Sequence, residues 1–404
     1  MDVAVLGGGL QGCCVAMALA DKGVRVTLYD RNAALLTRAA VANEGKIHLG
    51  YMYAGDPSLA TARTMIQGAL SFAPVLARRL GIGVDGIEVS RPAVYLVHRD
   101  SQHGLDEVTR HLHAVHALAL EAAAERPDAY FGRDLSAPLR AWTAEEQAEW
   151  YAPGVALAAF DTQELAVDPV ALAQSVRRRV EATPGIELRL DEEVVRVEAD
   201  GERMVVASRG SGGAARDCYD QVVNALWDGR LAIDATLGLR PGRRWMHRLR
   251  YGVVLRPPAG TRLPPTTTII HGPFGEVVNH GKGALNLLWY PACLAGVSHE
   301  LEPPDWPMVP AEPRRSAIWR ETLRSLARIV PALGEIDPDG AAEVEVKGGV
   351  IVAWGSTDID DPDSELHRRS DIGVTTTGRY HSIEPGKLTM APWFAELCAG
   401  RILG

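Results

Sequence analysis

The sequence MDVAVLGGGLQGCCVAMALADKGVRVTLYD, residues 1–30, decides the fold. Residues 2–6 form a short apolar run that is typical of a buried strand. Residues 7–12 follow directly and match the pattern G-x-G-x-x-G. The small, apolar residues 13–22 predict a helix, and the alternating, β-branched residues 24–29 predict a second strand. This order of strand, glycine turn, helix and strand predicts the start of a dinucleotide-binding domain.

The glycines, and the acid that follows the second strand, each have a physical role in such a domain. Gly7 permits a tight turn, Gly9 lets a pyrophosphate approach the backbone, and Gly12 allows the helix to pack closely on the strand. The helix N-terminus offers free N–H groups and the positive end of its dipole to the phosphates. Asp30 stands where an acid binds the ribose hydroxyls. The alternative is a glycine-rich turn without a ligand, and a site here fits either FAD or NAD.

Length and composition narrow the class of protein. A chain of 404 residues is long enough for two domains. The net charge of −9 argues against nucleic acid as the main partner. Five cysteines without paired spacing predict a reducing compartment, without disulfides or a structural zinc. Because no apolar run approaches about 18 residues and the first strand begins at residue 2, we expect a cytoplasmic protein without a membrane span or signal peptide.

Hydrophobic periodicity and turn residues outline the rest of the chain. Helices are predicted at residues 31–41, 57–80, 105–124, 143 onward, 170–182, 313–329 and 390–403. Strands are predicted at residues 93–98, within residues 186–197, near residues 204–207, and at residues 222–227, 251–255, 267–271 and 284–290. The last unit starts at residues 349–354 and passes through an acidic loop to residues 372–377. Residues 42–53 are polar and glycine-punctuated, which is typical of a loop held near a ligand. The proline-rich block from residue 239 to 346 has no second nucleotide pattern, so we assign it to substrate binding.

Three features resemble metal or anion sites, and a simpler interpretation is favoured for each. His111, His113 and His116 do not converge on one helical face, so we expect a solvated helix surface. The acidic residues 358–365 lack the glycine of a calcium loop and carry a proline, so a solvated turn is favoured. The arginines of residues 240–250 are expected at an exposed strand edge, with attraction of an anionic substrate as the alternative. No metal ligand is predicted.

Three segments together resemble the D-amino acid oxidase superfamily of FAD-dependent oxidoreductases: the N-terminal unit, residues 43–53 and residues 386–389. Residues 44–53, followed by residues 56–60, are similar to the segment after the first helix in L-2-hydroxyglutarate dehydrogenases. Residues 385–389 are similar to the C-terminal flavin segment of FAD-dependent glycerol-3-phosphate dehydrogenases. The resemblance covers the two ends and the middle of a cofactor-binding domain and leaves the block from 239 to 345 unmatched.

The resemblance implies an α/β fold with a Rossmann-like, discontinuous FAD-binding domain and a second, β-rich α+β substrate domain. The first would comprise residues 1–88, 155–238 and 346–404, and the second residues 89–154 and 239–345. The flavin ring would lie where the two domains meet. The return of the chain to a Gly-Lys-x-Thr turn and a helix favours FAD over NAD, because a second helix N-terminus can face the polar edge of a flavin.

The glycine turn and the resemblance together imply a set of cofactor-binding residues. They fall in six stretches, 7–12, 30–31, 43–48, 194, 224–225 and 382–389: Gly7, Gly9, Leu10, Gln11, Gly12, Asp30, Arg31, Asn43, Lys46, Ile47, His48, Val194, Asn224, Ala225, Ser382, Gly386, Lys387, Leu388 and Thr389. Residues 222–228 occupy the place of the family strand that packs on the cofactor, although Leu226 and Trp227 stand where the family has small residues.

The expected chemistry is removal of a hydride from a substrate carbon by flavin N5. An alcohol substrate also needs a base, for which His48 and His381 are the candidates in segments expected to line the flavin. Tyr53, Arg379 and Tyr380 are candidates for gripping a substrate carboxylate or hydroxyl. An amine substrate needs no strong base, only its neutral form. Covalent flavin attachment has no clear motif in this chain.

The sequence therefore predicts an FAD-dependent oxidoreductase that acts on a CH–OH carbon of a small polar metabolite such as a 2-hydroxy acid, a polyol or a sugar derivative. The alternative in the same fold is an amine or amino-acid oxidase. A more remote alternative is a nicotinamide-dependent dehydrogenase or a non-catalytic nucleotide-binding protein. The expected partners are a small-molecule substrate and an electron acceptor, either oxygen or another compound, whereas the oligomeric state is left open.

Overall fold

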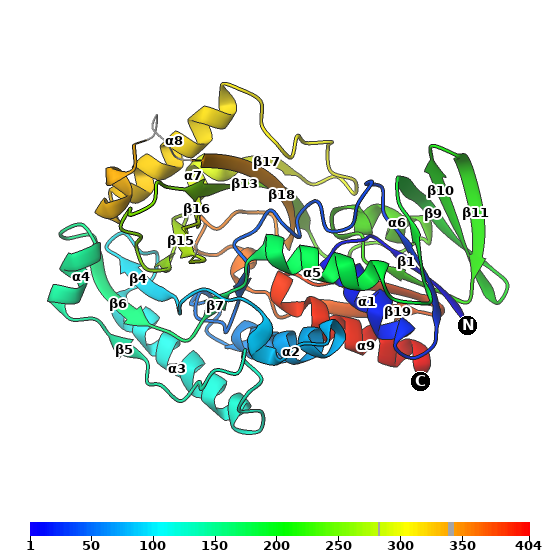
Figure 1. The fold of residues 1–404 in the computed structure, drawn as a ribbon, viewed down its shortest axis with the longest axis horizontal. Helices are drawn as coiled ribbons and strands as arrows, with labels where there is room; N and C mark the ends of the chain where they lie inside the picture. The colour runs from blue at the N-terminus through cyan, green and yellow to red at the C-terminus, as the bar shows by residue number, and fades with distance from the viewer. Residues whose placement is uncertain (282, 338–342) are drawn as a thin grey trace.

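Two large β-sheets meet at the centre of the molecule, and helices pack on both (Figure 1). The computed structural model describes residues 1–281, 283–337 and 343–404. One sheet has six strands, most of them parallel, and contains the N-terminal strand; the other has nine strands, most of them antiparallel. The predicted fold class, a Rossmann-like α/β part joined to a β-rich α+β part, is confirmed.

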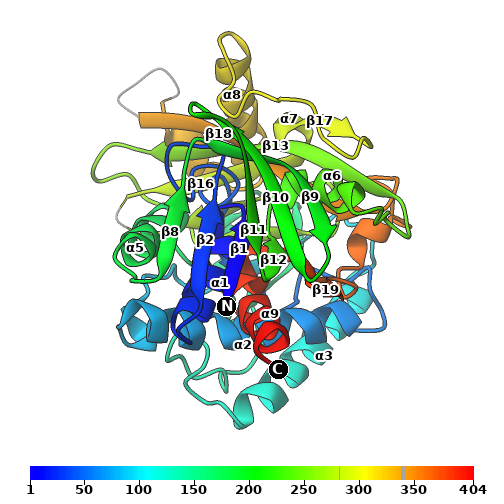
Figure 2. The ribbon, with the colours of Figure 1, turned by 90° about the vertical axis from the view of Figure 1, so that its right-hand side faces the viewer.

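The six-stranded sheet has the order β19-β20-β12-β1-β2-β8, with β19 antiparallel to β20 and every other pairing parallel. Its strands are β1 (Asp2–Leu6), β2 (Arg25–Tyr29), β8 (Ile186–Arg189), β12 (Gln221–Asn224), β19 (Gly373–Thr377) and β20 (Tyr380–Glu384). Figure 2 shows β8, β2 and β1 side by side. Helix α1 (Leu10–Ala20) joins β1 to β2, so the predicted opening βαβ unit is confirmed.

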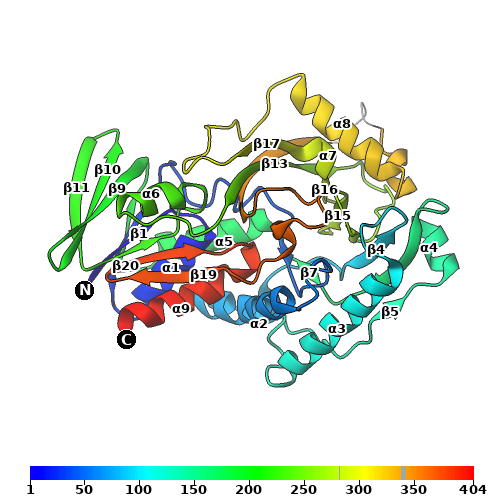
Figure 3. The same cartoon turned by 180° about the vertical axis from the view of Figure 1, so that it is seen from behind.

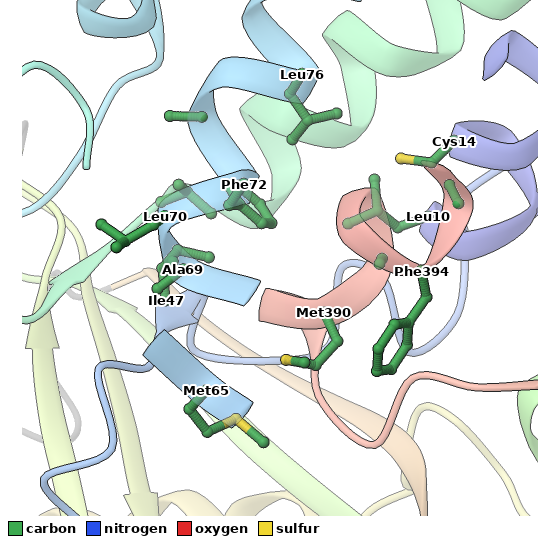
Figure 4. Close-up of a cluster of buried hydrophobic side chains, with 14 of the residues drawn as sticks. Leu10, Cys14, Ile47, Met65, Ala69, Leu70, Phe72, Leu76, Met390 and Phe394 are labelled. Carbon is green, nitrogen blue, oxygen red and sulfur yellow. The ribbon is translucent and has the colours of Figure 1, made fainter. Parts of the chain in front are cut away.

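Helices from both ends of the chain pack together against this sheet. These are α1, α2 (Ala60–Leu80), α5 (Pro169–Glu181) and α9 (Ala391–Leu403). Figure 3 shows α9 beside α1 and the pair β19–β20. In the buried cluster of Figure 4, Leu10 and Cys14 of α1 lie near Phe394 of α9, and Phe72 and Leu76 of α2 lie on the other side. Burial of each such large side chain stabilises the fold by about 1.5–3 kcal/mol.

The nine-stranded sheet has the order β17-β13-β16-β15-β14-β4-β6-β5, and β18 pairs with β13 along its whole length. Its strands are β4 (Val94–His98), β5 (Arg140–Ala141), β6 (Ala156–Asp161), β13 (Trp245–Arg256), β14 (Thr267–Ile270), β15 (Gly275–Asn279), β16 (Leu285–Trp289), β17 (Leu294–Ser298) and β18 (Glu343–Trp354). Helix α8 (Arg314–Ala327) packs on it. Strands β6 and β18 both lie in this sheet. The predicted domain boundaries assigned residues 156–161 and 346–354 to the cofactor-binding part.

The remaining elements connect these two parts. They are α3 (Leu105–Ala124), α4 (Ala144–Trp150), α6 (Arg230–Thr236), α7 (Tyr290–Cys293), the two-stranded pair β3 (Lys46–Ile47) and β7 (Leu165–Ala166), and the hairpin sheet β9 (Glu192–Asp200), β10 (Arg203–Gly210) and β11 (Gly213–Tyr219). Short 3-10 helices lie at η1 (Val84–Gly86), η2 (Trp227–Gly229), η3 (Pro331–Glu335), η4 (Glu365–His367) and η5 (Leu388–Met390). The strands predicted within residues 186–197 correspond to β8 and the first part of β9, which belong to different sheets.

Two local predictions are wrong. Residues 31–41 form turns and bends instead of a helix. Leu36 has a positive φ of 59°, and its N–H donates to the carbonyl of Gly8 rather than to a carbonyl four residues earlier. His111 and His116 lie on the buried face of α3 and not on a solvated face. His111 Nε2 is 3.3 Å from the carbonyl of Gly50, so tertiary hydrogen bonding compensates for burial of the imidazole.

The arginine run is also placed differently from the prediction. Strand β13 is an interior strand that pairs with β16, β17 and β18. Arg248 is only 1% exposed and Arg250 9% exposed. Arg248 pairs with Asp358 at 2.6 Å, and Arg250 pairs with Glu44. Buried guanidinium groups need such partners, so these two arginines lie inside the protein and not at a protected sheet edge.

Candidate active site

A cavity of about 890 Å³ lies between the glycine turn, the loop of residues 36–48 and the C-terminal turn of residues 385–388. Many of the predicted cofactor-binding residues line it: Gly7, Gly9, Leu10, Gln11, Asp30, Arg31, Asn43, Lys46, His48, Val194, Ala225, Gly386, Lys387 and Leu388. A volume of this size suits a cofactor. The cavity lies beyond the carboxyl ends of β1 and β2, where nucleotides bind in open parallel sheets.

The glycine turn leaves room at the point where a pyrophosphate would approach. A Cβ atom added to Gly9 would have no other atom within 4 Å, and the backbone there has an ordinary φ of −74°. A Cβ atom on Gly12 would lie 1.8 Å from the carbonyl oxygen of Gly7. Gly12 therefore serves helix packing, as the sequence predicted, while Gly9 faces open space in the cavity wall. The N–H of Gly8 donates to the carboxylate of Asp30 at 2.8 Å, which fixes this acid beside the turn.

The C-terminal turn closes onto the N-terminal half of the cavity. The backbone N–H of His48 donates to Oγ1 of Thr389 at 3.0 Å, and that hydroxyl lies 3.3 Å from the carbonyl oxygen of Lys46. The side-chain amide of Gln11 donates to the carbonyl of Ala391 at 3.1 Å. The glycine turn, the polar loop and the C-terminal turn are thus joined by direct hydrogen bonds, in agreement with the sequence prediction that the two ends of the chain share one site.

Six cationic side chains among the described residues line the cavity. Arg31 and Arg38 pair with Asp228, and Arg209 pairs with Glu193. The other three are Lys46, Arg250 and Lys387. Arg250 forms an ion pair with Glu44. Burial alone would raise the pKa of Glu44, but the guanidinium of Arg250 holds it below the usual range. Lys46 is 2.9 Å from a carboxylate oxygen of Glu276. Burial, together with neighbouring guanidinium groups, lowers the pKa of Lys387 to about 7.

A buried carboxylate lies behind His48. Nδ1 of His48 is 3.4 Å from Oε1 of Glu164, which has no exposed surface. Burial lowers the pKa of His48, and the Glu164 charge acts in the opposite direction. At neutral pH the imidazole is therefore uncharged and can accept a proton. Glu164 and Arg250 are site residues that the sequence reasoning missed; the polar segment around residue 164 and the arginine run were the available signals.

Some predicted cofactor residues support the cavity from behind instead of lining it. These are Gly12, Ile47, Asn224, Ser382 and Thr389, all of which are buried or packed against backbone. Asn224 donates to Oδ1 of Asp234 at 3.0 Å, and the hydroxyl of Ser382 donates to the same carboxyl group at 2.9 Å. Two lining residues that were not predicted, Arg38 and Asp228, form an ion pair at 3.0 Å.

Four predicted catalytic side chains are not among the described residues that line the cavity. Arg379, Tyr380 and His381 lie at the start of β20, whereas the cavity is near the carboxyl end of that strand. His381 is hydrogen-bonded to Thr376 at 3.0 Å, and burial lowers its pKa to about 4. Tyr53 is buried with its ring 6.1 Å from that of His48. Only His48 of the predicted catalytic set thus faces the cavity.

Residues 2–399 match the family described as DAO, FAD dependent oxidoreductase. The chain belongs to this family. It is an enzyme of the FAD-dependent oxidoreductase class, and FAD is its cofactor, so the nicotinamide and non-catalytic alternatives are not supported. The cavity fits FAD, because Gly9 leaves a space beside the α1 N-terminus, and Asp30 and Lys387 line the same cavity.

Solved structures with the same fold include several oxidases and a dehydrogenase that are named for different substrates. Glycine oxidase from Geobacillus kaustophilus has a TM-score of 0.69 at 17% identity, covering 100% of this chain and 94% of that one. L-proline dehydrogenase from P. horikoshii has a TM-score of 0.67 at 15% identity, covering 99% and 92%. L-alpha-glycerophosphate oxidase from Mycoplasma pneumoniae has a TM-score of 0.64 at 15% identity, covering 100% and 94%. No curated protein sequence gave a significant match.

Neither a membrane-spanning helix nor a metal-binding cluster is found among the described residues. No helix within them combines the length and the apolar character that a membrane span requires. No group of three or more histidine, cysteine, aspartate or glutamate side chains within them is arranged to hold a metal ion. All five cysteines are free thiols.

Proposed function

We propose that this protein uses FAD to oxidise the carbon next to nitrogen in a small amino or imino acid. Two of the three similar structures described above are named for glycine and proline, and the third for glycerophosphate. All three names refer to compounds that carry an anionic group. The proposal therefore has two parts, recognition of an acid group and oxidation of a C–N bond. It differs from the sequence-based prediction, which favoured oxidation of a CH–OH carbon.

The observation that carries the proposal is the uneven pairing of the cations in the cavity wall. Arg250 has Glu44 as its partner, and Lys46 has Glu276 and Glu164. Lys387 lines the same cavity and has no ion-pair partner within the described residues. A buried ammonium group without a counter-ion attracts an anion, because a carboxylate at this position would stabilise its charged form.

The same environment suits an amine substrate. An amine must lose its ammonium proton before the neighbouring C–H bond can give up a hydride. Lys387 is itself an amine in this cavity, and burial and Arg369 lower its pKa to about 7. Desolvation and positive charge would act in the same way on a substrate ammonium group and favour its neutral form. Such a site needs no dedicated base for the amine.

The residues that would carry out the reaction divide into two groups. The glycine turn, Asp30, Gly386 and Leu388 would hold FAD, which supplies a hydride acceptor when bound. Lys387 would bind the acid group of the substrate and orient the neighbouring C–H bond. The buried pair of Arg250 and Glu44 keeps that part of the wall rigid and close to neutral, so that the charge of Lys387 is the one left for the substrate.

A second candidate is oxidation of a 2-hydroxy acid, the function predicted from the sequence. The specific observation in its favour is His48, a neutral imidazole in the cavity wall with a carboxylate behind it. Such an imidazole can accept the hydroxyl proton of an alcohol. Both candidates share the acid group and differ only in the atom attached to the oxidised carbon.

Anaerobic reduction of the FAD-loaded protein separates the candidates. Bleaching of the visible flavin absorbance is followed with glycine, sarcosine, proline and both enantiomers of alanine, and in parallel with glycolate, both enantiomers of lactate and glycerol 3-phosphate. Bleaching by amino or imino acids, with an imine, a keto acid or ammonia as product, supports the proposal. Bleaching by hydroxy acids alone supports the second candidate. Bleaching by ethylamine as rapid as by glycine would remove the acid-group part.

A matched pair of variants tests the acid-group contact. Lys387→Met removes the unpaired ammonium from the cavity wall, and Lys347→Met removes a partly exposed lysine of β18 that pairs with Glu345. The proposal predicts a raised KM for carboxylate substrates in the first variant only. Equal KM values in the two variants would exclude Lys387 from substrate binding.

A further inference from the structure

Glu164 is the only carboxylate in the described chain that contacts both Lys46 and His48, two residues of the cavity wall. It lies directly before β7, which pairs with β3 so that Ala166 faces Lys46 and Leu165 faces Ile47. The same antiparallel register brings Glu164 opposite His48. Glu164 itself has no exposed surface, so its side chain reaches the cavity only through its neighbours.

Four groups surround the Glu164 carboxylate. The hydroxyl of Tyr95 donates to Oε1 at 2.5 Å, and the backbone N–H of Leu49 donates to Oε2 at 2.8 Å. Nζ of Lys46 lies 3.4 Å from Oε1, and Nδ1 of His48 lies 3.4 Å from the same oxygen. The 3.4 Å separation from Nδ1 of His48 is an electrostatic contact, because that nitrogen makes no hydrogen bond within the described residues. Burial alone would raise the pKa of Glu164, but the charges of His48 and Lys46 and the hydroxyl of Tyr95 lower it to about 2.

We infer that Glu164 is a positioning residue that fixes the proton of His48 on Nδ1 and so leaves Nε2 as the proton acceptor facing the cavity. A negative charge beside Nδ1 stabilises a proton on that nitrogen, as carboxylates do behind metal-bound and catalytic imidazoles. The contact with Lys46 holds the second cavity residue at the same time. The inference rests on the proposed flavin site but not on the choice between amine and alcohol.

The charge of Glu164 also makes His48 more basic than burial alone would leave it. Burial lowers the pKa of His48, Lys387 and Lys46 act in the same direction, and Glu164 opposes them. Glu276 forms an ion pair with Lys46, and the charge of Glu44 also acts on it, so both carboxylates balance the lysine charge. Removal of the Glu164 charge should therefore shift the titration of His48 to lower pH by at least about one pH unit, since two charges at this distance interact strongly in a buried site.

The test uses the full FAD-loaded chain with ¹³C-labelled histidine. The Cε1–H signal of His48, assigned by its loss in His48→Gln, is titrated in the wild type, in Glu164→Gln and in Glu164→Asp. We expect a lower titration midpoint in Glu164→Gln and recovery of most of the shift in Glu164→Asp, which restores the charge. Tyr95→Phe is the control that loses a hydrogen bond to Glu164 but keeps its charge, and its midpoint should stay near that of the wild type.

The outcomes separate this inference from the proposed function. Equal midpoints in the wild type and Glu164→Gln, or equal shifts in Glu164→Gln and Tyr95→Phe, would overturn the positioning role. If Glu164→Gln fails to fold, Glu164→Asp and Tyr95→Phe decide: a normal midpoint in both supports the charge, and a shifted midpoint in Tyr95→Phe alone overturns it. Because the titration needs no substrate, a protein that oxidises no amino acid would still give a clear answer about Glu164.

Discussion

Replacing Arg250 by methionine would remove the partner of a buried acid. Arg250 and Glu44 have side chains that are 10% and 13% exposed, and they form an ion pair in the wall of the FAD cavity. Removing one member of a buried pair leaves the other charge without a partner and costs about 3–5 kcal/mol. An entropy of unfolding of about 2.1 cal/mol/K per residue gives roughly 0.85 kcal/mol/K for this chain. The expected decrease in Tm is therefore about 4–6 °C.

The size of the decrease should depend on pH. In the wild type the guanidinium holds down the pKa of Glu44, so the pair contributes stability that is present at neutral pH and is lost as Glu44 protonates in acid. In Arg250→Met that influence is gone and the pKa of Glu44 rises. Glu44 then becomes neutral at a higher pH, so the difference in Tm between variant and wild type should shrink from pH 7 to pH 4.

Thermal unfolding followed by circular dichroism measures this effect, with two controls. Arg256→Met removes an arginine from the same strand whose side chain is 52% exposed, and its Tm should stay within about 1 °C of the wild type. The double variant Arg250→Met/Glu44→Gln removes both charges and should recover most of the lost stability. A single variant that melts with the wild type, or a double variant that melts as low as the single one, would refute the claim that this pair is buried and coupled.

Two more predictions concern the cavity, and a third concerns His271, which lies outside it. Gly9→Ala should fold normally, because a Cβ atom there meets open space, but its affinity for FAD should decrease about tenfold or more. Gly12→Ala should lower Tm even without FAD, because its Cβ atom would lie 1.8 Å from a carbonyl oxygen. FAD titration and melting curves of both variants check this pair. Burial lowers the pKa of Lys387 to about 7, so the KM for an acidic substrate should rise as pH increases above 7. Lys387→Met should raise this KM roughly ten- to a hundredfold at pH 6 and abolish its pH dependence. An unchanged pH dependence of KM in the variant would disprove this role. Burial and neighbouring imidazoles lower the pKa of His271 from 6.5 to about 3, so the unfolded chain takes up a proton there first and stability falls as pH decreases below 6.5, by up to about 1.4 kcal/mol per pH unit. His271→Asn should show a shallower decrease of Tm between pH 6 and pH 4, and a slope equal to that of the wild type would contradict the prediction.

The parts of the fold that could be predicted are those determined by local sequence. The apolar run before Gly7 and the alternation before Asp30 are sufficient to define two buried parallel strands, because burial on both faces leaves few other residue patterns. The return of the chain to the site at Lys387 was also predictable, since the turn carries its own residue pattern. Helix α3 has the predicted bounds, because its alanine- and leucine-rich sequence favours a helix locally.

The features that escaped prediction depend on partners distant in the sequence. The charge of Arg250 indicated an exposed position, and its burial depends on the contact with Glu44, more than two hundred residues away, and on Tyr290. Residues 31–41 have a helical composition, but a hydrogen bond to Gly8 and the cavity wall hold them in turns. His381 was in the predicted segment but at the amino end of β20, and the direction of that strand relative to the cavity was not visible in the sequence.

The bond between Thr389 and the backbone of His48 has a consequence for how the enzyme acquires its flavin during synthesis. A ribosome that has translated the first 350 residues has produced the glycine turn and the strands beside it, but not the wall formed by residues 385–391. The nascent polypeptide would hold the nucleotide end of FAD only loosely at that stage. We therefore expect tight flavin capture to begin only after residues 385–391 have left the exit tunnel.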